Sequence, residues 1–148
     1  MLEAVKKLSA KVKAIDQGKE LNQILTNESM QAQIIDLNQR QIYEQGIQAD
    51  GTPTGEYSPK TIALKIQHGD ARGVPGRVDH ITGLDTGITY DSMNVKAEPD
   101  GIVINAEDRN GFFEIEPKGL GLTKESINEI IPEVRQSLIQ RLRRLIAA

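Results

Sequence analysis

The sequence of 148 residues contains no cysteine, and this absence excludes several kinds of site. Without a thiol, the chain can form no disulfide framework, no thiolate metal site and no cysteine nucleophile. Tryptophan is also absent, and aromatic residues make up only 3% of the chain. The core is therefore predicted to be aliphatic, built from Leu, Ile and Val.

Two further absences bear on partners and location. The net charge is −3, so no broad basic field is present that would attract the whole protein to nucleic acid. No apolar run approaches the roughly 18 residues of a membrane helix. The first residues, MLEAVKKLSAKVKAIDQG, are amphipathic and lack a small-residue cleavage site, so we expect no secretory signal. We expect a soluble protein, without a membrane partner, made in a reducing cytoplasm.

The length predicts a single domain, residues 1–148, with a real core. Residues 1–46 are predicted to form N-terminal helices. In the first helix, apolar residues recur at spacings of three and four and mark one face. These residues are Val5, Leu8, Val12 and Ile15.

A second helix is predicted over about residues 19–45, with Gly46 as its stop signal. Its apolar residues fall on more than one face. A two-sided helix contacts two neighbours, or one neighbour and a partner chain. We therefore expect its outer face, around Met30, Ile34 and Leu37, to form subunit contacts.

The middle of the chain is rich in turn residues. Ser58-Pro59 predicts a helix start with Ser as the N-cap, and the helix to Gln67 is expected to bury Ile62 and Ile66. Residues 68–83 contain four glycines and predict a long flexible loop. The basic side chains of this loop, Arg72 and Arg77, are predicted to take part in subunit contacts and to be accessible to protease in the free subunit.

Residues 84–116 are predicted to form a small antiparallel sheet. Apolar residues alternate with other residues in two runs. The first run is Met93, Val95 and Ala97, and the second is Ile102, Ile104 and Ala106. The turn sequence EPDG separates the two runs, which predicts a hairpin with one buried face. A short further strand is expected over 112–116.

A C-terminal helix is predicted over residues 123–147, with Thr123 as its N-cap and an apolar stripe from Ile127 to Leu145. Pro132 removes one backbone donor, so we expect a kink or a split near Ile131. The order of elements predicts an α+β fold: N-terminal helices, a small antiparallel sheet with a hairpin, and a C-terminal helix.

Asp85-Thr86-Gly87 is the signature tripeptide of aspartic proteases, in which two carboxylates share one proton. That fold is almost all β and has a small residue after the tripeptide, whereas this chain has Ile88 and a helical pattern over more than half of its length. We interpret Asp85 or Thr86 as a turn cap and Gly87 as a residue with positive φ. A homodimeric protease is the enzymatic alternative.

Five ionisable residues lie in or beside the glycine-rich loop: His68, Asp70, Asp79, His80 and Asp85. Their spacing does not direct two ligands toward one metal ion, and we interpret them as solvent-exposed polar residues. Gly119 and Gly121 lack the third glycine of a dinucleotide-binding loop. We therefore predict no catalytic residue, no metal site and no cofactor.

Four arginines near the C-terminus form a local basic cluster: Arg135, Arg141, Arg143 and Arg144. One interpretation is a solvated face that favours the negative end of the helix. The alternative is contact with an acidic partner surface or with a phosphate backbone, with Arg141 and Arg144 on one side of the helix.

Three segments in a fixed order resemble a known family. They are DLNQRQIYEQGIQADGTPTGEYSPKTIALK at 36–65, LDTGITYDSMNV at 84–95 and GLGLTKESINEIIPEVRQSLIQRL at 119–142. Together they resemble small neck or tail-completion proteins of tailed phages and prophages, particularly those of Bacteroidetes-type hosts and the crAss-like group. The chain is similar, more distantly, to minor tail and virion-morphogenesis proteins. The matching residues are Tyr57, Ser58, Pro59, Leu84, Thr86, Gly87, Ser92 and Met93.

The resemblance implies a structural protein of the virion rather than an enzyme. Copies would form a six- or twelvefold ring at the head–tail junction or the tail end, with non-specific proximity to the DNA in the channel. Other neck, portal or tail proteins would be its partners. The family usually has an aromatic residue after Thr-Gly, where this chain has Ile88. A host adaptor or regulatory binding module is the third function considered, beside the protease.

Overall fold

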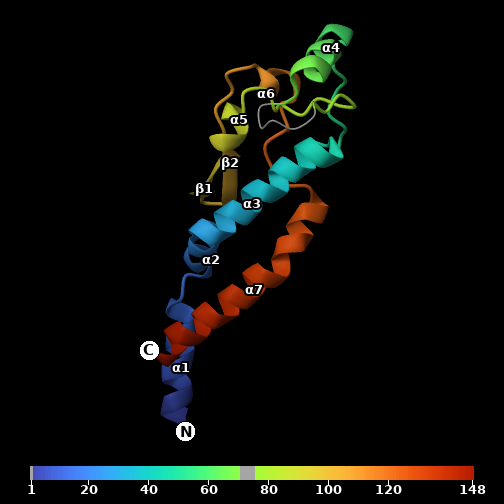
Figure 1. The fold of residues 1–148 in the computed structure, drawn as a ribbon. Helices are drawn as coiled ribbons and strands as arrows, with labels where there is room; N and C mark the ends of the chain where they lie inside the picture. Colours follow the sequence, from blue (N-terminus) through green and yellow to red (C-terminus); the bar gives the residue numbers. More distant parts are fainter. Residues whose placement is uncertain (1, 71–75) are drawn as a thin grey trace.

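The order of helices and strands is α+β, as predicted (Figure 1). The computed structural model describes residues 2–70 and 76–148. Within them, the elements follow in the order α1 (Leu2–Ala14), α2 (Gln17–Leu25), α3 (Glu28–Arg40), the π-helical turn η1 (Gln41–Gln45), α4 (Pro59–His68), α5 (Ile88–Asp91), β1 (Asn94–Glu98), β2 (Gly101–Asn105), α6 (Phe112–Ile115) and α7 (Lys124–Ala147).

The single helix predicted over residues 19–45 is wrong, because the chain breaks between α2 and α3. The Asn27 side chain accepts a hydrogen bond from the backbone N–H of Met30 at 2.9 Å and so caps the start of α3. Asp16 caps α2 in the same way, through the N–H of Lys19 at 3.0 Å. Each cap satisfies an amide that has no partner inside its helix.

The first part of the core forms on α3. Met30, Ile34 and Leu37 are 2%, 0% and 5% exposed. They pack against Val95, Ile104 and Ile130, which come from β1, β2 and α7. The prediction that these three residues form an outer face for subunit contacts is therefore wrong, because the hairpin and α7 of the same chain cover them.

A second cluster lies beyond the C-terminal end of α3. Its buried members are Ile42, Leu84, Tyr90, Met93 and Phe112. Ile35 and Leu120 pack against both clusters and so join them into one continuous core. The first cluster is aliphatic apart from Met30, which agrees with the predicted core of Leu, Ile and Val. The second cluster departs from that prediction, because Tyr90, Phe112 and Met93 make up three of its five buried side chains.

The predicted hairpin is confirmed. Val95 pairs with Ile104 on the buried side, and Lys96 pairs with Val103. The further strand expected over 112–116 is wrong, because Phe112–Ile115 forms the one-turn helix α6. Asp108 accepts hydrogen bonds from the N–H groups of Phe112 and Phe113 at 2.7 and 2.9 Å, and these bonds start the helical turn.

Two amide side chains, one on α3 and one at the start of η1, hold the segment that leads into α7. Asn38 and Gln41, together called the amide pair, are both fully buried. Asn38 Nδ2 donates to the carbonyl oxygens of Gly119 and Gly121 at 2.9 and 3.0 Å. Gln41 Oε1 accepts from the N–H of Thr123 at 2.8 Å. The amide pair thereby fixes where α7 begins.

The C-terminal helix is confirmed, with Thr123 as its N-cap. Pro132 lies inside α7, and the helix runs on past it, so the predicted split near Ile131 is absent. The carbonyl that loses its partner belongs to Asn128, an exposed residue at which water can take the missing place.

The molecule is elongated, and its helices follow one another along its length (Figure 1). Helices α3 and α7 run in opposite directions, α4 lies at one end of the molecule, and α1 lies at the other end together with the C-terminus. Among the described residues, every helix is too short or too polar to cross a lipid bilayer.

Burial at the hairpin predicts unequal effects on stability. Replacement Ile104→Ala removes a buried side chain and is expected to lower the free energy of unfolding by about 2–4 kcal/mol. The control Lys96→Ala changes an exposed residue one position from the paired Val95 and is expected to stay within about 0.5 kcal/mol. Urea melts measure both values, and equal, small losses would contradict the register.

Candidate functional site

The residues of the quoted motifs all take part in local structure. Ser58 accepts a hydrogen bond from the N–H of Thr61 at 3.2 Å and caps α4, with Pro59 at the first helical position, as predicted. The Tyr57 hydroxyl accepts from the N–H of Thr82 at 2.9 Å. Tyr57 therefore joins the start of α4 to the segment before the Asp-Thr-Gly tripeptide. The expected burial of Ile62 and Ile66 is wrong, because Ile62 is only half-buried and Ile66 is exposed on α4.

The motif from Leu84 to Met93 also shapes the backbone. Leu84 and Met93 are buried in the second core cluster. Gly87 has φ of 86° at the start of α5, which confirms the predicted positive φ. Ser92 Oγ donates to the carbonyl of Thr89 and accepts from the N–H of Glu107, which ties the end of α5 to the chain after β2.

Asp85 lacks the setting of a protease aspartate. It is exposed, it follows an irregular segment rather than a strand, and it accepts a hydrogen bond from Asn110 Nδ2 at 3.2 Å. A cavity of about 500 Å³ beside it is lined by Tyr57, Lys65 and Phe112, among other residues. Thr86 Oγ1 lies 3.5 Å from the N–H of Ile88, in line with its predicted role in the turn.

The interpretation of Asp70 as a solvent-exposed residue is wrong. Its carboxylate is buried and accepts three hydrogen bonds. The donors are the ammonium of Lys65, the hydroxyl of Tyr43 at 3.1 Å and the backbone N–H of Arg77 at 3.1 Å. We call these four residues the Asp70 cluster. The Lys65 ammonium also donates to the carbonyl of Leu84 at 3.3 Å and lies 4.9 Å from the centre of the Tyr57 ring.

Burial and pairing shift two pKa values in this cluster. Burial alone lowers the pKa of Lys65, but the hydrogen bond to Asp70 and the nearby negative charge outweigh it, and the net shift is upward. Burial, followed by the hydrogen bond to Asp70, raises the pKa of the Tyr43 hydroxyl. The cluster therefore keeps Lys65 charged at neutral pH and works as a structural ion pair.

His80 is also buried rather than exposed. Its Nε2 lies 3.1 and 3.0 Å from the carbonyl oxygens of Ile42 and Tyr43, which η1 leaves without partners in the helix. A side chain at Gly46, where φ is 63°, would come within 2.7 Å of the His80 ring. In the described part of the chain, no three His, Cys, Asp or Glu residues gather as a metal site would need.

The predicted contact residues of the glycine-rich loop have different outcomes. Arg72 lies outside the described residues. Arg77 is held in place: its guanidinium pairs with Asp79 at 2.9 Å and lies 5.8 Å from the centre of the Tyr43 ring. Within the predicted flexible loop, Asp70 bonds to Lys65 of α4 and Tyr43 of η1, and His80 bonds to the backbone of η1.

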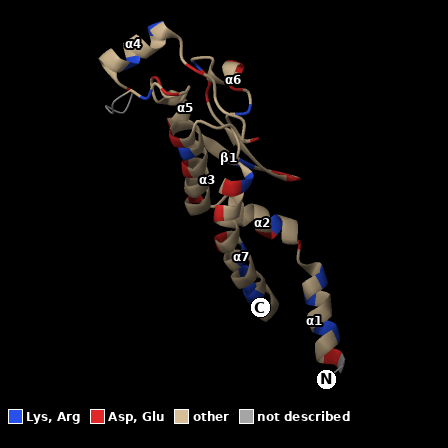
Figure 2. Ribbon diagram, turned by 90° about the vertical axis from the view of Figure 1, so that its right-hand side faces the viewer, with Lys and Arg blue, Asp and Glu red and all other residues tan. Residues whose placement is uncertain are grey.

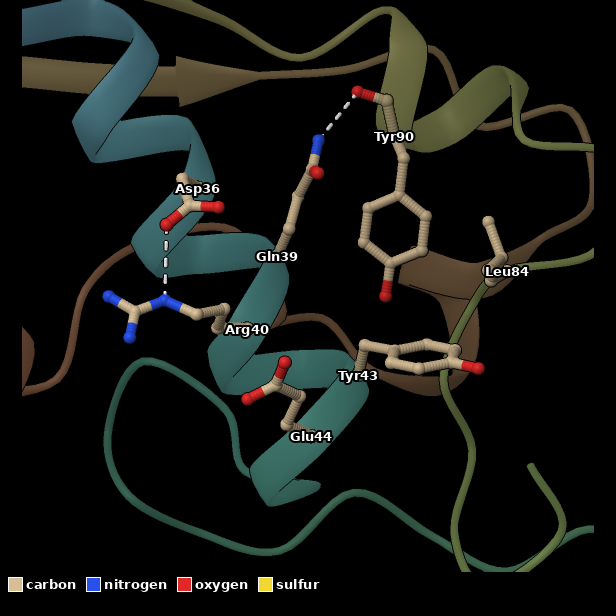
Figure 3. Close-up of a pocket in the computed structure, with 7 residues that line it drawn as sticks. All are labelled: Asp36, Gln39, Arg40, Tyr43, Glu44, Leu84 and Tyr90. Atoms are coloured by element: carbon tan, nitrogen blue, oxygen red, sulfur yellow. Dashed lines mark hydrogen bonds and ion pairs between the residues drawn. The ribbon is translucent and has the colours of Figure 1, made fainter. Parts of the chain in front are cut away.

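A second cavity, of about 240 Å³, lies beside the C-terminal end of α3 (Figure 3). Arg40 pairs there with Asp36 at 3.1 Å, and its hydrogen bond to Glu129 raises the pKa of the guanidinium. Gln39 donates to the carbonyl of Tyr90 at 3.0 Å. The charges of Arg40 and Asp36 therefore neutralise each other, and the Gln39 amide has a hydrogen-bond partner. The residues that line this cavity do not pair a nucleophile with a base.

The largest departure from ordinary burial is on α1. Every side chain from Glu3 to Ala14 is exposed, including the apolar stripe of Val5, Leu8 and Val12 at 59%, 49% and 43%. Helix α1 touches the rest of the chain near the end of α7, where Lys11 Nζ donates to the carbonyl of Ile146 at 3.3 Å.

The apolar stripe of α7 is also only half covered. Four of its apolar side chains are more than one third exposed: Ile127, Ile131, Ile139 and Leu145. Arg141 is occupied within the chain, because it pairs with Glu20 and donates to Gln23 of α2. Arg144 is exposed near the C-terminus. We take the exposed faces of α1 and α7 as the candidate assembly surface.

Comparison of the chain with protein-family models, with curated proteins and with solved structures finds no match.

The Asp70 cluster predicts a large and pH-dependent stability effect. Replacement Asp70→Asn leaves the Lys65 ammonium buried without its counter-charge. We expect the free energy of unfolding to fall by about 3–5 kcal/mol. The control Asp79→Asn breaks the exposed pair with Arg77 and should cost less than about 1 kcal/mol. Denaturant melts measure both.

The sign of the pH dependence follows from Lys65. Its pKa is raised in the folded protein, so the stabilisation is complete below the ordinary value of 10.5 and is lost as the pH rises through the folded value. The stability difference between the wild type and Asp70→Asn should therefore shrink above about pH 10.5. A difference that grows with pH in that range would contradict the ion pair.

Substitutions in the Asp-Thr-Gly tripeptide are expected to change stability through the backbone at Gly87, and not through loss of a catalytic carboxylate at Asp85. Replacement Asp85→Asn is expected to change the unfolding free energy by less than about 0.5 kcal/mol. Gly87→Val puts a β-branched residue at φ of 86° and is expected to cost about 1–3 kcal/mol. Cleavage of casein at acidic pH by the wild type, abolished in Asp85→Asn, would contradict the non-catalytic role.

Proposed function

We propose that this chain is a structural, non-enzymatic subunit of a tailed-phage virion. Copies of it form a six- or twelvefold ring at the head–tail junction or at the tail end, and other neck, portal or tail proteins are the partners. The observation that carries the proposal is the apolar stripe of α1, which lies outside the core of its own chain.

A helix such as α1 needs a partner. Isolated helices of its length, 13 residues, are marginal in water, and most helical stability comes from packing an amphipathic face. Contiguous exposed apolar side chains on a soluble protein indicate a protein–protein interface. The exposed stripes of α1 and α7 therefore support a subunit that completes its burial by assembly.

The structural roles of the motif residues support the same proposal. Gly87, Ser92 and Tyr57 each hold a turn or a crossing of two chain segments in place. The protease alternative gains no support, because Asp85 is exposed in an irregular segment and the described residues hold only two strands. Exposed arginines near the C-terminus, such as Arg144, are the groups that would meet DNA phosphates in the channel.

Location within the particle tests the proposal. Gold-labelled antibodies against the chain, applied to virions from a host that carries its gene, are expected to mark the head–tail junction or the tail end. Averaged electron micrographs of the labelled assembly should show rings. Absence of the chain from purified virions by mass spectrometry would contradict the proposal, and capture by a host protein in its place would favour the adaptor alternative.

A further inference from the structure

The charge of this chain is divided between its two ends. We call residues 2–15 and 135–148 the basic arm, which contains α1 and the second half of α7. The basic arm carries eight Lys and Arg residues and one Glu, a net charge of +7. Residues 16–134 carry ten basic and twenty acidic residues, a net charge of −10. Figure 2 shows basic residues along α1 and the end of α7, and both acidic and basic residues on the remainder.

An apolar groove opens on the acidic part of the molecule. It has a volume of about 420 Å³ and lies between β2, the segment before α7 and the first turns of α7. Its lining includes Ile102, Ile104, Leu120, Leu122, Ile127 and Ile130. Ile127 is 44% exposed, and Ile131, one turn further along α7, is 38% exposed. The groove therefore continues as an apolar strip along α7.

The α1 helix of the same chain cannot fill this groove. Its contact with α7 is at Ile146, whereas the groove lies at Ile127. Nineteen residues of helix separate these two positions, a distance of roughly 28 Å at 1.5 Å per residue. Figure 1 likewise places α1 beyond the far end of α7. The chain thus contains an apolar helix face and an apolar groove that it cannot bring together by itself.

We propose that α1 of one copy docks in the groove of a second copy. Val5, Leu8 and Val12 would pack against the groove at Ile127 and Ile131, and the lysines of α1 would remain at its edges. The charges favour this occupant, because residues 2–15 carry four lysines and one glutamate, a net charge of +3, whereas residues 16–134 carry −10, and unlike charges attract and orient two partners. The hairpin that brings β2 into the groove ends in exposed Glu98 and Asp100.

This contact joins two different surfaces of the same protein. Such a heterologous contact leaves one arm and one groove free at the ends of every open oligomer, and repetition closes into a ring or continues as a filament. The inference rests on the proposed function, for which it supplies the subunit contact. It moves that contact from Met30, Ile34 and Leu37, which are buried, to α1 and the groove.

Disulfide trapping tests the contact directly, because the wild type has no cysteine. Leu8→Cys and Ile127→Cys change exposed residues, so both variants should fold. After mixing and mild oxidation, we expect a covalent dimer of one Leu8→Cys chain with one Ile127→Cys chain. The double variant should give a ladder of oligomers or a covalently closed ring. Ala10→Cys, on the opposite face of α1, is the matched control and should cross-link to Ile127→Cys several-fold less.

The charge argument adds a second readout. The yield of the Leu8–Ile127 cross-link is expected to fall several-fold between about 50 mM and about 1 M salt, because salt screens the attraction. An equal yield at both salt concentrations would overturn the role of charge in the contact. Circular dichroism of each variant confirms that a low yield does not come from unfolding.

Four outcomes would overturn the inference. They are dimers of Leu8→Cys with itself, equal trapping of Ala10→Cys, no trapping at all, and no trapping while the wild type binds anionic vesicles or duplex DNA through its arm. The proposed function fails separately. A trapped ladder from a chain that is absent from virions would support the contact and contradict the function, whereas virion rings without trapping would do the reverse.

Discussion

The buried amide pair at the junction of α3 and η1 is the constraint on which the arrangement of the helices depends. Asn38 and Gln41 bind the backbone of Gly119, Gly121 and Thr123, and so they set the starting point of α7 against α3. A buried amide that loses its partner costs the full desolvation of that group, whereas an apolar contact tolerates sliding. The hydrogen bonds therefore fix one position of α7 against α3. The apolar core contributes most of the buried surface.

The same helix organises the other end of the molecule through η1. The π-helical turn leaves the carbonyls of Ile42 and Tyr43 free, and His80 binds them. The Tyr43 hydroxyl donates to Asp70, whose carboxylate also holds Lys65. One departure from regular α-helix thus fastens a glycine-rich segment that would otherwise have little apolar surface to hold it.

The consequence for function is a division of labour along the chain. Helix α3 is covered by the hairpin and α7, whereas α1 keeps its apolar stripe outside. In the proposed assembly, α3 holds the fold of the subunit together and α1 contacts a second copy. The basic arm and residues 16–134 carry opposite charges, and this difference favours contact of α1 with the acidic part of another copy.

The sequence by itself determined the elements whose signals are local. The cap at Ser58, the hairpin around Val95 and Ile104, the positive φ at Gly87 and the helix after Thr123 all follow from neighbouring residues. Only the tertiary structure decided which apolar and polar groups are buried. Periodicity marks an apolar face on α1 and on α3 alike, but distant segments cover one and leave the other exposed. Asp70 and His80 likewise look like solvated loop residues until a helix far away in sequence supplies their partners, because burial is a property of contacts between segments rather than of the residues themselves.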